Sequence, residues 1–274
     1  MNNGCNRWSI KNQLHLVLSA TLIFVLCLCG FGTDSLASAA TLSEIQQRGY
    51  INIAVKDNIR PLGFKDDKGN LQGLEIDLAR KLAADLLGKA EAVKFVPVAN
   101  SDRLAVVFNH QVDLAIARIT ATESRSRLVS FSVPYYFDSA ALVTKDTSIQ
   151  KLENLGQRKI AVLNYSSTIA DVKYFIPKAE LVSVNSYTEA REKIASGAVA
   201  AFAADISLLT GWVQEDPQYR ILPIKLSAEP LSVAMAKGLQ YDELRREVNE
   251  AIARYTVTGW LKERTNFWGL SDPN

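Results

Sequence analysis

The 274-residue sequence predicts an α/β protein made of two doubly wound lobes. Three observations lead to this prediction. Between Tyr50 and Ile119, apolar runs of strand length alternate with amphipathic helical stretches, which is the order of a doubly wound sheet. The same alternation restarts at Ala140. With 48% hydrophobic residues, a chain of this length can bury either one large core or two of ordinary size.

The first lobe opens with a short helix, because Ser43 lies near its start and Gly49 can end it. Further along, Gly69-Asn70 is typical of a hairpin turn, and Ser101 or Asp102 can cap a later helix. The predicted elements are a helix over 41–49, a strand over 50–55, a hairpin over 64–71, a helix over 74–82, a strand over 93–98, a helix over 103–109 and a strand over 114–119.

The second lobe repeats this rhythm, and Ser186 with Glu189 forms a capping box before one of its helices. Its predicted elements are strands over 140–144, 159–163, 181–184 and 198–204 and helices over 151–155 and 187–196. A strand over 231–236 and an amphipathic helix over 241–258 then return to the first lobe. We therefore expect lobe 1 to comprise 41–139 plus 232–274 and lobe 2 to comprise 140–231, joined by a hinge of two segments near 136–144 and 229–235.

Residues 1–40 have the order of a secretory signal peptide. Arg7 and Lys11 precede an uncharged apolar stretch over 14–33, and Ala37-Ser38-Ala39 supplies the small residues of a cleavage site. A retained membrane anchor is the alternative, because the apolar stretch is long enough to span a bilayer. Cleavage predicts a soluble protein released into the periplasm.

Cysteine and charge exclude several classes of function for the mature chain. All three cysteines precede residue 40, so the mature chain has no disulfide, thiolate nucleophile or cysteine metal site. Its only histidine, His110, gives no metal site by itself, and we expect no metal and no cofactor. Two of the 31 basic and one of the 29 acidic residues lie in the signal segment, which leaves 29 basic and 28 acidic residues. This balance gives no indication of nucleic-acid binding.

The stretch 113–139 combines a buried strand with a polar loop. The apolar run 114–119 is followed by a group of hydroxyl and guanidinium side chains, namely Thr120, Thr122, Ser124, Arg125 and Arg127. Ligands of open α/β sheets bind beyond the carboxyl ends of the strands. A guanidinium with hydroxyls beside it is suited to a carboxylate, although the same arginines could simply extend into water.

The segment ITATESRSRLVSFSVPYY resembles the signature of the family 3 extracytoplasmic solute-binding proteins, the polar amino acid receptors of ABC importers. The family pattern is a strand, then T-x-T-x-E-R, then F-S-x-P-Y, and the resemblance extends over about 42–270. This chain departs from the pattern at Glu123-Ser124-Arg125, where the acid has moved by one position while the arginine keeps its spacing from Thr120. The resemblance implies the type II periplasmic-binding-protein fold, in which a ligand binds between two lobes.

The resemblance also implies which residues bind the ligand. Arg125 matches the arginine that holds the α-carboxylate, and Thr120 matches the hydroxyl beside it. Asp205 matches the aspartate that binds the α-ammonium, with a helix N-cap as its alternative role. A loop of hydroxyl residues in the second lobe matches the family's anion-binding loop, with an ordinary N-cap as the alternative; it comprises Ser166, Ser167 and Thr168.

Side-chain specificity is expected from basic residues of the first lobe. Lys56 and Arg103 occupy positions where the similar aspartate/glutamate-binding members carry basic residues, and Arg118 adds a third cation. Cations that converge on a pocket favour an anionic ligand. The alternative is that one or more of them point to solvent or to the neighbouring Asp57 or Asp102.

The resemblance therefore predicts a monomeric, non-enzymatic periplasmic receptor that binds an L-amino acid and docks on an ABC permease. The basic residues favour glutamate or aspartate over a polar neutral ligand. Two other classes remain. A cyclohexadienyl or arogenate dehydratase-like enzyme shares the fold and needs a general acid in the cleft, for which Asp57 and Glu123 are the unassigned carboxylates. A receptor sensor module would retain an amino-terminal membrane helix.

Overall fold

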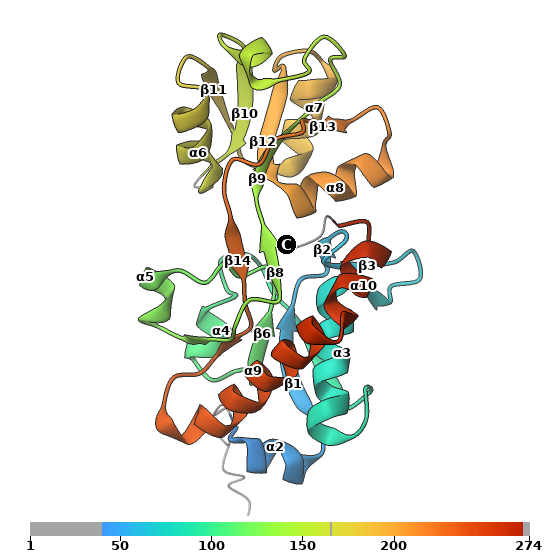
Figure 1. Ribbon diagram of the computed structural model, residues 1–274, viewed down its shortest axis with the longest axis vertical. Helices are drawn as coiled ribbons and strands as arrows, with labels where there is room; N and C mark the ends of the chain where they lie inside the picture. The colour runs from blue at the N-terminus through green and yellow to red at the C-terminus, as the bar shows by residue number, and fades with distance from the viewer. Residues whose placement is uncertain (1–39, 165, 271–274) are drawn as a thin grey trace, which may run out of the picture. The chain divides into compact units, whose positions relative to one another are not determined.

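The computed structural model describes residues 40–164 and 166–270, so the predicted signal peptide lies outside the described residues. Two five-stranded sheets, each packed with helices, form two lobes, as Figure 1 shows. This architecture confirms the predicted fold class. No helix within the described ranges is long and apolar enough to cross a membrane.

The first lobe is built on a sheet of order β5-β1-β6-β15-β7. Strand β1 pairs in parallel with β5 and β6, whereas β15 runs antiparallel to β6 and β7. The elements of this lobe are α2 (Leu42–Arg48), β1 (Ile51–Val55), β2 (Asn58–Ile59), β3 (Gly63–Lys65), β4 (Leu71–Gln72), α3 (Leu74–Leu87), β5 (Val93–Pro97), α4 (Ala105–Phe108), β6 (Leu114–Ile116), α5 (Glu123–Ser126), β7 (Ser130–Phe131), β15 (Ala234–Met235), η2 (Leu239–Tyr241), α9 (Asp242–Val257) and α10 (Trp260–Phe267).

The second lobe is built on a sheet of order β11-β10-β12-β9-β13. Strand β10 pairs in parallel with β11 and β12, and β9 runs antiparallel to β12 and β13. The elements of this lobe are β9 (Ala140–Thr144), η1 (Leu152–Leu155), β10 (Lys159–Leu163), α6 (Thr168–Phe175), β11 (Glu180–Val184), α7 (Tyr187–Ala195), β12 (Ala201–Asp205), α8 (Ile206–Glu215) and β13 (Arg220–Ile221).

Two strands connect the lobes. β8 (Tyr136–Asp138) leads into the second lobe and β14 (Glu229–Leu231) leads back, and the two pair antiparallel with Phe137 opposite Pro230. Figure 1 shows them side by side between the sheets. The two crossovers predicted from the sequence therefore form one paired connection.

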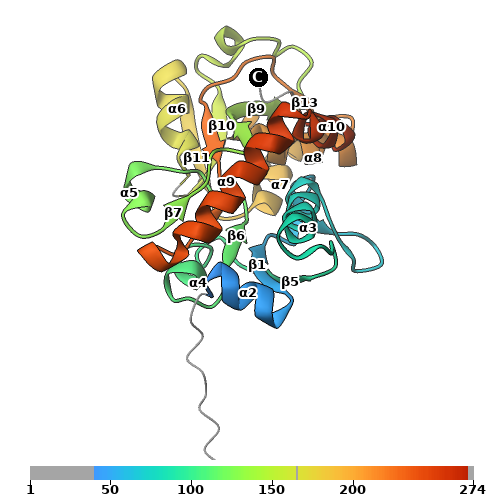
Figure 2. The ribbon, with the colours of Figure 1, turned by 60° about the horizontal axis from the view of Figure 1, so that its bottom comes forward.

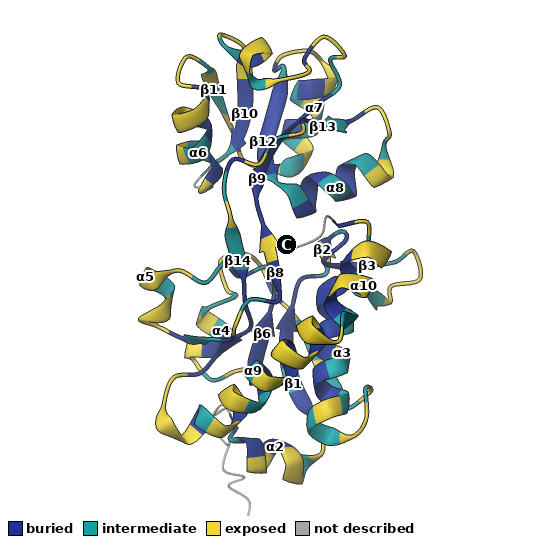
Figure 3. Cartoon of the chain, viewed as in Figure 1, coloured by how far each residue is buried: buried dark blue, intermediate teal, exposed yellow. Residues whose placement is uncertain are grey.

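The cores follow from the apolar patterns of the sequence. The central strands β6 and β9 are buried along their whole length, as the dark strands in Figure 3 illustrate. Helix α9, seen in red across the first lobe in Figure 2, buries one apolar stripe and exposes charged residues elsewhere. The stripe comprises Leu244, Val248, Ala251, Ile252 and Tyr255.

Several helix starts differ from the predictions. Thr41 caps α2 in place of Ser43, because its hydroxyl accepts from the Glu44 amide while the Glu44 carboxylate accepts from the Thr41 amide. Helix α4 is shorter than predicted, and neither Ser101 nor Asp102 caps it with a side chain; their side chains bond to each other instead. At α7, Ser186 accepts from the Glu189 amide as predicted, but the Glu189 carboxylate accepts from the Asn185 amide at 2.8 Å, so the predicted capping box is only half formed.

Candidate functional site

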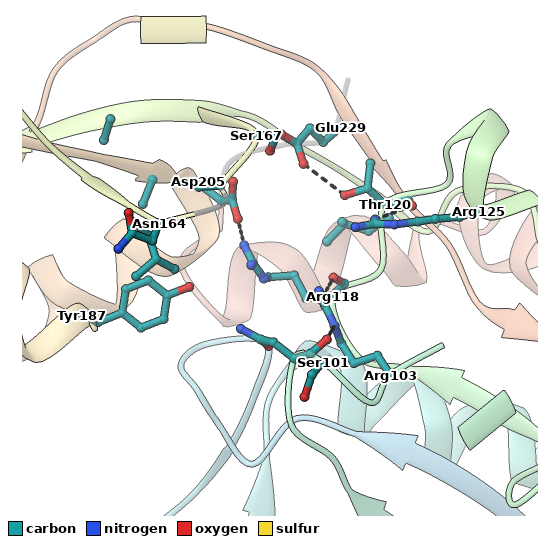
Figure 4. Close-up of a pocket in the computed structure, with 16 residues that line it drawn as sticks. Ser101, Arg103, Arg118, Thr120, Arg125, Asn164, Ser167, Tyr187, Asp205 and Glu229 are labelled. Carbon is teal, nitrogen blue, oxygen red and sulfur yellow. Dashed lines mark hydrogen bonds and ion pairs between the residues drawn. The ribbon is translucent and has the colours of Figure 1, made fainter. Parts of the chain in front are cut away.

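A cavity of about 450 Å³ lies between the two sheets. Its walls come from loops that follow strands β5, β6 and β10, from the end of β12, and from α5 and β14. Figure 4 shows these side chains converging from both lobes. The lining residues are Asn100, Ser101, Arg103, Arg118, Thr120, Arg125, Leu163, Asn164, Ser166, Ser167, Tyr187, Ala203, Ala204, Asp205, Glu229 and Leu231.

Arg125 projects into this cavity from the short helix α5. Thr122 starts that helix, because its hydroxyl accepts from the Arg125 amide at 3.3 Å. The Arg125 Nη1 donates to the carbonyl oxygen of Thr120 at 2.9 Å, which fixes the guanidinium beside the Thr120 side chain. Burial lowers the pKa of Arg125, while the nearby Glu229 carboxylate acts in the opposite direction. Arg125 and Thr120 therefore lie together, as the sequence predicted.

Arg118 crosses the cavity and forms an ion pair with Asp205. Its backbone lies in the left-handed region, with φ of 50°, and its amide donates to Glu75 Oε1 at 2.6 Å. β6 ends at Ile116, and this left-handed turn follows two residues later. The turn explains why the strand predicted over 114–119 is shorter in the structure. Only 15% of the Arg118 and 13% of the Asp205 side chain is exposed, so the pair joins the lobes inside the site.

Asp205 occupies the N-cap position of α8, but its side chain makes no capping hydrogen bond. Its carboxylate is directed into the cavity toward Arg118. The capping role considered from the sequence therefore does not account for this carboxylate.

Arg103 lines the cavity, although its donors hold the neighbouring loops. Nη1 donates to the carbonyl oxygen of Ala117 at 3.1 Å and also to that of Arg118, and Nε donates to that of Asn100 at 3.0 Å. Burial and the nearby Arg118 and Arg125 lower the pKa of Arg103 to about 10. Arg103 thus supplies positive charge and fixes the loop that carries Arg118.

Lys56 does not line the cavity. Its side chain is buried, with the residue 3% exposed, and Nζ donates to the carbonyl oxygen of Val98 at 2.6 Å. Burial and the nearby Arg103 lower its pKa. The residue follows β1 as expected, but it joins β1 to the end of β5 and lies outside the wall of the cavity.

Of the predicted hydroxyl loop, Ser166 and Ser167 line the cavity and Thr168 does not. Thr168 is fully buried and its hydroxyl lies 2.7 Å from the Ser166 hydroxyl. Its amide donates to the Ser166 hydroxyl oxygen at 3.3 Å, so Thr168 orients Ser166 within the loop.

Glu229 is the main site residue that the sequence reasoning missed. Its Oε2 accepts from the Thr120 hydroxyl at 3.0 Å, and its Oε1 accepts from the Ser167 hydroxyl at 3.3 Å. The sequence placed a crossover at this position, and an acidic residue before Pro230 at a crossover was the available signal. Asn100, Ser101, Asn164 and Tyr187 also line the cavity without having been predicted.

The carboxylates considered for an enzymatic role lie elsewhere. Asp57 pairs with Lys65 at 2.9 Å, and the Glu123 side chain is 91% exposed and pairs with Arg127. Neither lines the cavity. Among residues 40–164 and 166–270, no group of three or more histidine, cysteine, aspartate or glutamate residues could hold a metal ion.

Several amino acid-binding proteins are similar to this chain. The chain is 28% identical to the ABC transporter glutamine-binding protein GlnH of Bacillus subtilis, over 94% of this chain and 96% of that protein. It is 26% identical to the glutamate-binding protein GluB of Corynebacterium glutamicum, over 90% of this chain and 87% of that protein. A crystal structure of solute receptors for L-cysteine of Neisseria gonorrhoeae matches with a TM-score of 0.70 and 30% identity, over 83% of this chain and 93% of that one.

Residues 51–271 match the family described as bacterial extracellular solute-binding proteins, family 3. The match covers most of the chain, and it includes both sheets, the paired connection and the cavity between them. The chain belongs to the family 3 bacterial extracellular solute-binding proteins.

Proposed function

We propose that this protein is the substrate-binding component of an ABC amino acid importer and that it binds an acidic L-amino acid, glutamate or aspartate, between its lobes. The observation that supports this most is the charge of the cavity. Three guanidiniums line it together with two carboxylates, which leaves an excess of one positive charge; they belong to Arg103, Arg118, Arg125, Asp205 and Glu229. Glutamate and aspartate carry the complementary set, two carboxylates and one ammonium.

Each pole of the ligand has a partner in this proposal. The α-carboxylate binds Arg125, with the hydroxyls of Thr120, Ser166 and Ser167 around it. A bidentate arginine–carboxylate pair fixes orientation as well as charge. At an effective dielectric constant near 20, such a pair about 4 Å apart attracts by ~4 kcal/mol before the cost of desolvation. The α-ammonium binds Asp205.

The side-chain carboxylate of the ligand pairs with the remaining guanidiniums, those of Arg118 and Arg103. Lys56 and Thr168 are not ligand contacts in this proposal, because hydrogen bonds within their own lobes engage them. The relatives named above bind glutamine, glutamate and L-cysteine, which supports an amino acid as the ligand class. The positive excess in the cavity favours an acidic member of that class.

The cellular setting belongs to the same proposal. Residues 1–40 direct secretion and are cleaved; lobe 1 (41–139 plus 232–274) and lobe 2 (140–231) close on the ligand; and the closed monomer docks on the membrane permease. The extracellular assignment of the family supports secretion. Ligand contacts with both lobes would stabilise the closed arrangement over the open one.

Isothermal titration calorimetry of the purified protein with the twenty amino acids tests the proposal. We expect L-glutamate or L-aspartate to bind at least tenfold more tightly than L-glutamine. Tighter binding of glutamine would contradict the acidic specificity, and no binding of any amino acid would contradict the receptor function.

Arg125→Ala should weaken binding of the preferred amino acid by roughly 100-fold or more, because two charge-assisted hydrogen bonds of about 1.5–3 kcal/mol each are lost. Arg127→Ala is the matched control, since Arg127 lies two residues away with its side chain 77% exposed and pairs with Glu123 on the surface. Equal effects of the two substitutions on affinity would argue against a carboxylate-binding role for Arg125.

A further inference from the structure

Two bridges made by the chain's own charged side chains join the lobes inside the cavity. The first is the ion pair between Arg118 of the first lobe and Asp205 of the second. The second runs through Glu229, whose carboxylate accepts from Thr120 of the first lobe at 3.0 Å and from Ser167 of the second at 3.3 Å. Figure 4 shows Arg118 reaching Asp205, and Glu229 lying beside Thr120 and Ser167.

These bridges engage the same groups that the proposed function assigns to the ligand. Asp205, the proposed partner of the ligand ammonium, is paired with a guanidinium of the chain. Thr120 and Ser167, proposed partners of the α-carboxylate, donate to a carboxylate of the chain. Arg118 and Glu229 therefore present one positive and one negative group to the two ends of the site, as a zwitterionic ligand would.

We propose that Arg118 and Glu229 act as an internal counterpart of the ligand, so that an amino acid binds by exchanging with both. This inference rests on the proposed function for the identity of the ligand. In the free protein the two bridges stabilise the closed arrangement, and the lobes open to admit the ligand and close on it again. When the ligand binds, its ammonium replaces Arg118 as the partner of Asp205. Its α-carboxylate replaces Glu229 as the acceptor of the Thr120 and Ser167 hydroxyls. Glu229 therefore competes with the ligand carboxylate and lowers the affinity of the site for the ligand.

The surroundings of Arg118 suit such an exchange. Its amide is held by the buried Glu75, so the backbone stays in place while the side chain changes partner. Its Nε is buried and has no hydrogen-bond partner among the described residues, which leaves a donor free for a ligand carboxylate. Once released from Asp205, the guanidinium can therefore turn to the acidic side chain of the ligand.

The position of Glu229 ties the second bridge to the connection between the lobes. Glu229 begins β14 and lies opposite Asp138 of β8, so its carboxylate originates from the connection and contacts both lobes. Like charges placed side by side in a binding site repel each other and weaken the affinity for the ligand. A ligand carboxylate that approaches Arg125 meets this repulsion from the Glu229 carboxylate, which lies near Arg125.

The exchange is tested with Glu229→Gln, Arg118→Gln and the control Glu123→Gln, which neutralises a carboxylate that does not line the cavity. Without ligand, small-angle X-ray scattering should give a larger radius of gyration for Glu229→Gln and Arg118→Gln than for the wild type and the control. In calorimetry, Glu229→Gln should bind glutamate and glutamine about tenfold more tightly or better. Arg118→Gln should bind glutamine more tightly than the wild type and lose the preference for glutamate.

The outcomes separate this inference from the proposed function. Weaker binding by Glu229→Gln would make Glu229 a direct ligand contact and overturn the exchange. Scattering and affinities identical to those of Glu123→Gln would also overturn it. If the wild type and all variants bind no amino acid, the proposed function fails, whereas the scattering of the free proteins still decides whether the bridges hold the lobes together. Thermal melting of each variant confirms that the variant is folded, and Arg118→Lys, which keeps the charge, should retain the wild-type radius.

Discussion

Glu75 shows how a single buried residue shapes the site without lining it. It is fully buried in the first turn of α3 and accepts from the Arg118 amide and from the Tyr135 hydroxyl, each at 2.6 Å on Oε1. Its Oε2 is buried and has no hydrogen-bond partner among the described residues. Burial raises the pKa of this carboxyl group, against the hydrogen bonds from Tyr135 and Arg118 and the charge of the nearby Arg103. Glu75 therefore acts as a positioning residue that holds Arg118 in its left-handed turn.

Glu75→Gln should make the free energy of unfolding less dependent on pH. A carboxyl group with a raised pKa stabilises the folded state below its ordinary value of 4.5, and this contribution is lost as the pH rises through the folded pKa. Above pH 4.5 the wild type should therefore lose up to ~1.4 kcal/mol per pH unit relative to the variant. Urea unfolding at pH 5 and pH 8 measures this difference. A wild type that gains stability relative to the variant between these pH values would show that Glu75 is charged in the folded protein.

At the scale of elements, Asp113 joins the first helix to the first sheet. This residue directly precedes β6 and is 2% exposed. Its carboxylate forms an ion pair with Arg48 of α2 and accepts from the amides of Asn52 at 2.7 Å and Ala40 at 3.2 Å. One side chain thus satisfies donors from three separate segments.

Asp113→Ala should lower the free energy of unfolding by about 3–5 kcal/mol, because it leaves a partly buried arginine and two amides without their acceptor. Asp113→Asn is the matched variant; it keeps one oxygen acceptor and should cost less. Chemical denaturation of both variants measures the effect. A loss below about 1 kcal/mol for Asp113→Ala would mean that water replaces the carboxylate.

The sequence predicts where the strands lie more reliably than it predicts which way the side chains after each strand point. The apolar runs before Lys56 and before Asp205 both form the predicted strands β1 and β12. One residue past its strand, however, Lys56 turns back to a backbone carbonyl, and nothing in the local pattern separates it from Asp205 at the end of β12. Glu229 could not be predicted because its role depends on Thr120, 109 residues earlier in the chain. Local periodicity does not report such contacts.

For the whole molecule, the two lobes also approach each other outside the cavity. Gly211 of α8 faces the backbone of Arg60, which follows β2 in the first lobe. A Cβ atom at position 211 would collide with the carbonyl oxygen of Arg60 and would lie 3.4 Å from the Arg60 Cβ. The Arg60 guanidinium lies 3.9 Å from the centre of the Phe64 ring, so the Arg60 side chain is held within its own lobe. Gly211 therefore allows an approach of the lobes that alanine would prevent.

Gly211→Ala should separate stability from ligand binding. Within α8, alanine favours the helix over glycine by up to ~1 kcal/mol, and each lobe keeps its own sheet when the collision pushes the lobes apart, so the free energy of unfolding of the free protein should change by less than about 1 kcal/mol. The collision with Arg60 opposes the close approach of the lobes, so the affinity for the preferred amino acid should fall about tenfold or more, because the ligand has to meet both lobes at once. Calorimetry and urea unfolding of Gly211→Ala and of the control Gly156→Ala, where the nearest atom is an ordinary 3.5 Å away, measure both effects. Unchanged affinity in Gly211→Ala would mean that the ligand-bound lobes do not approach each other at Arg60, and closure around the cavity would then depend on contacts other than this one.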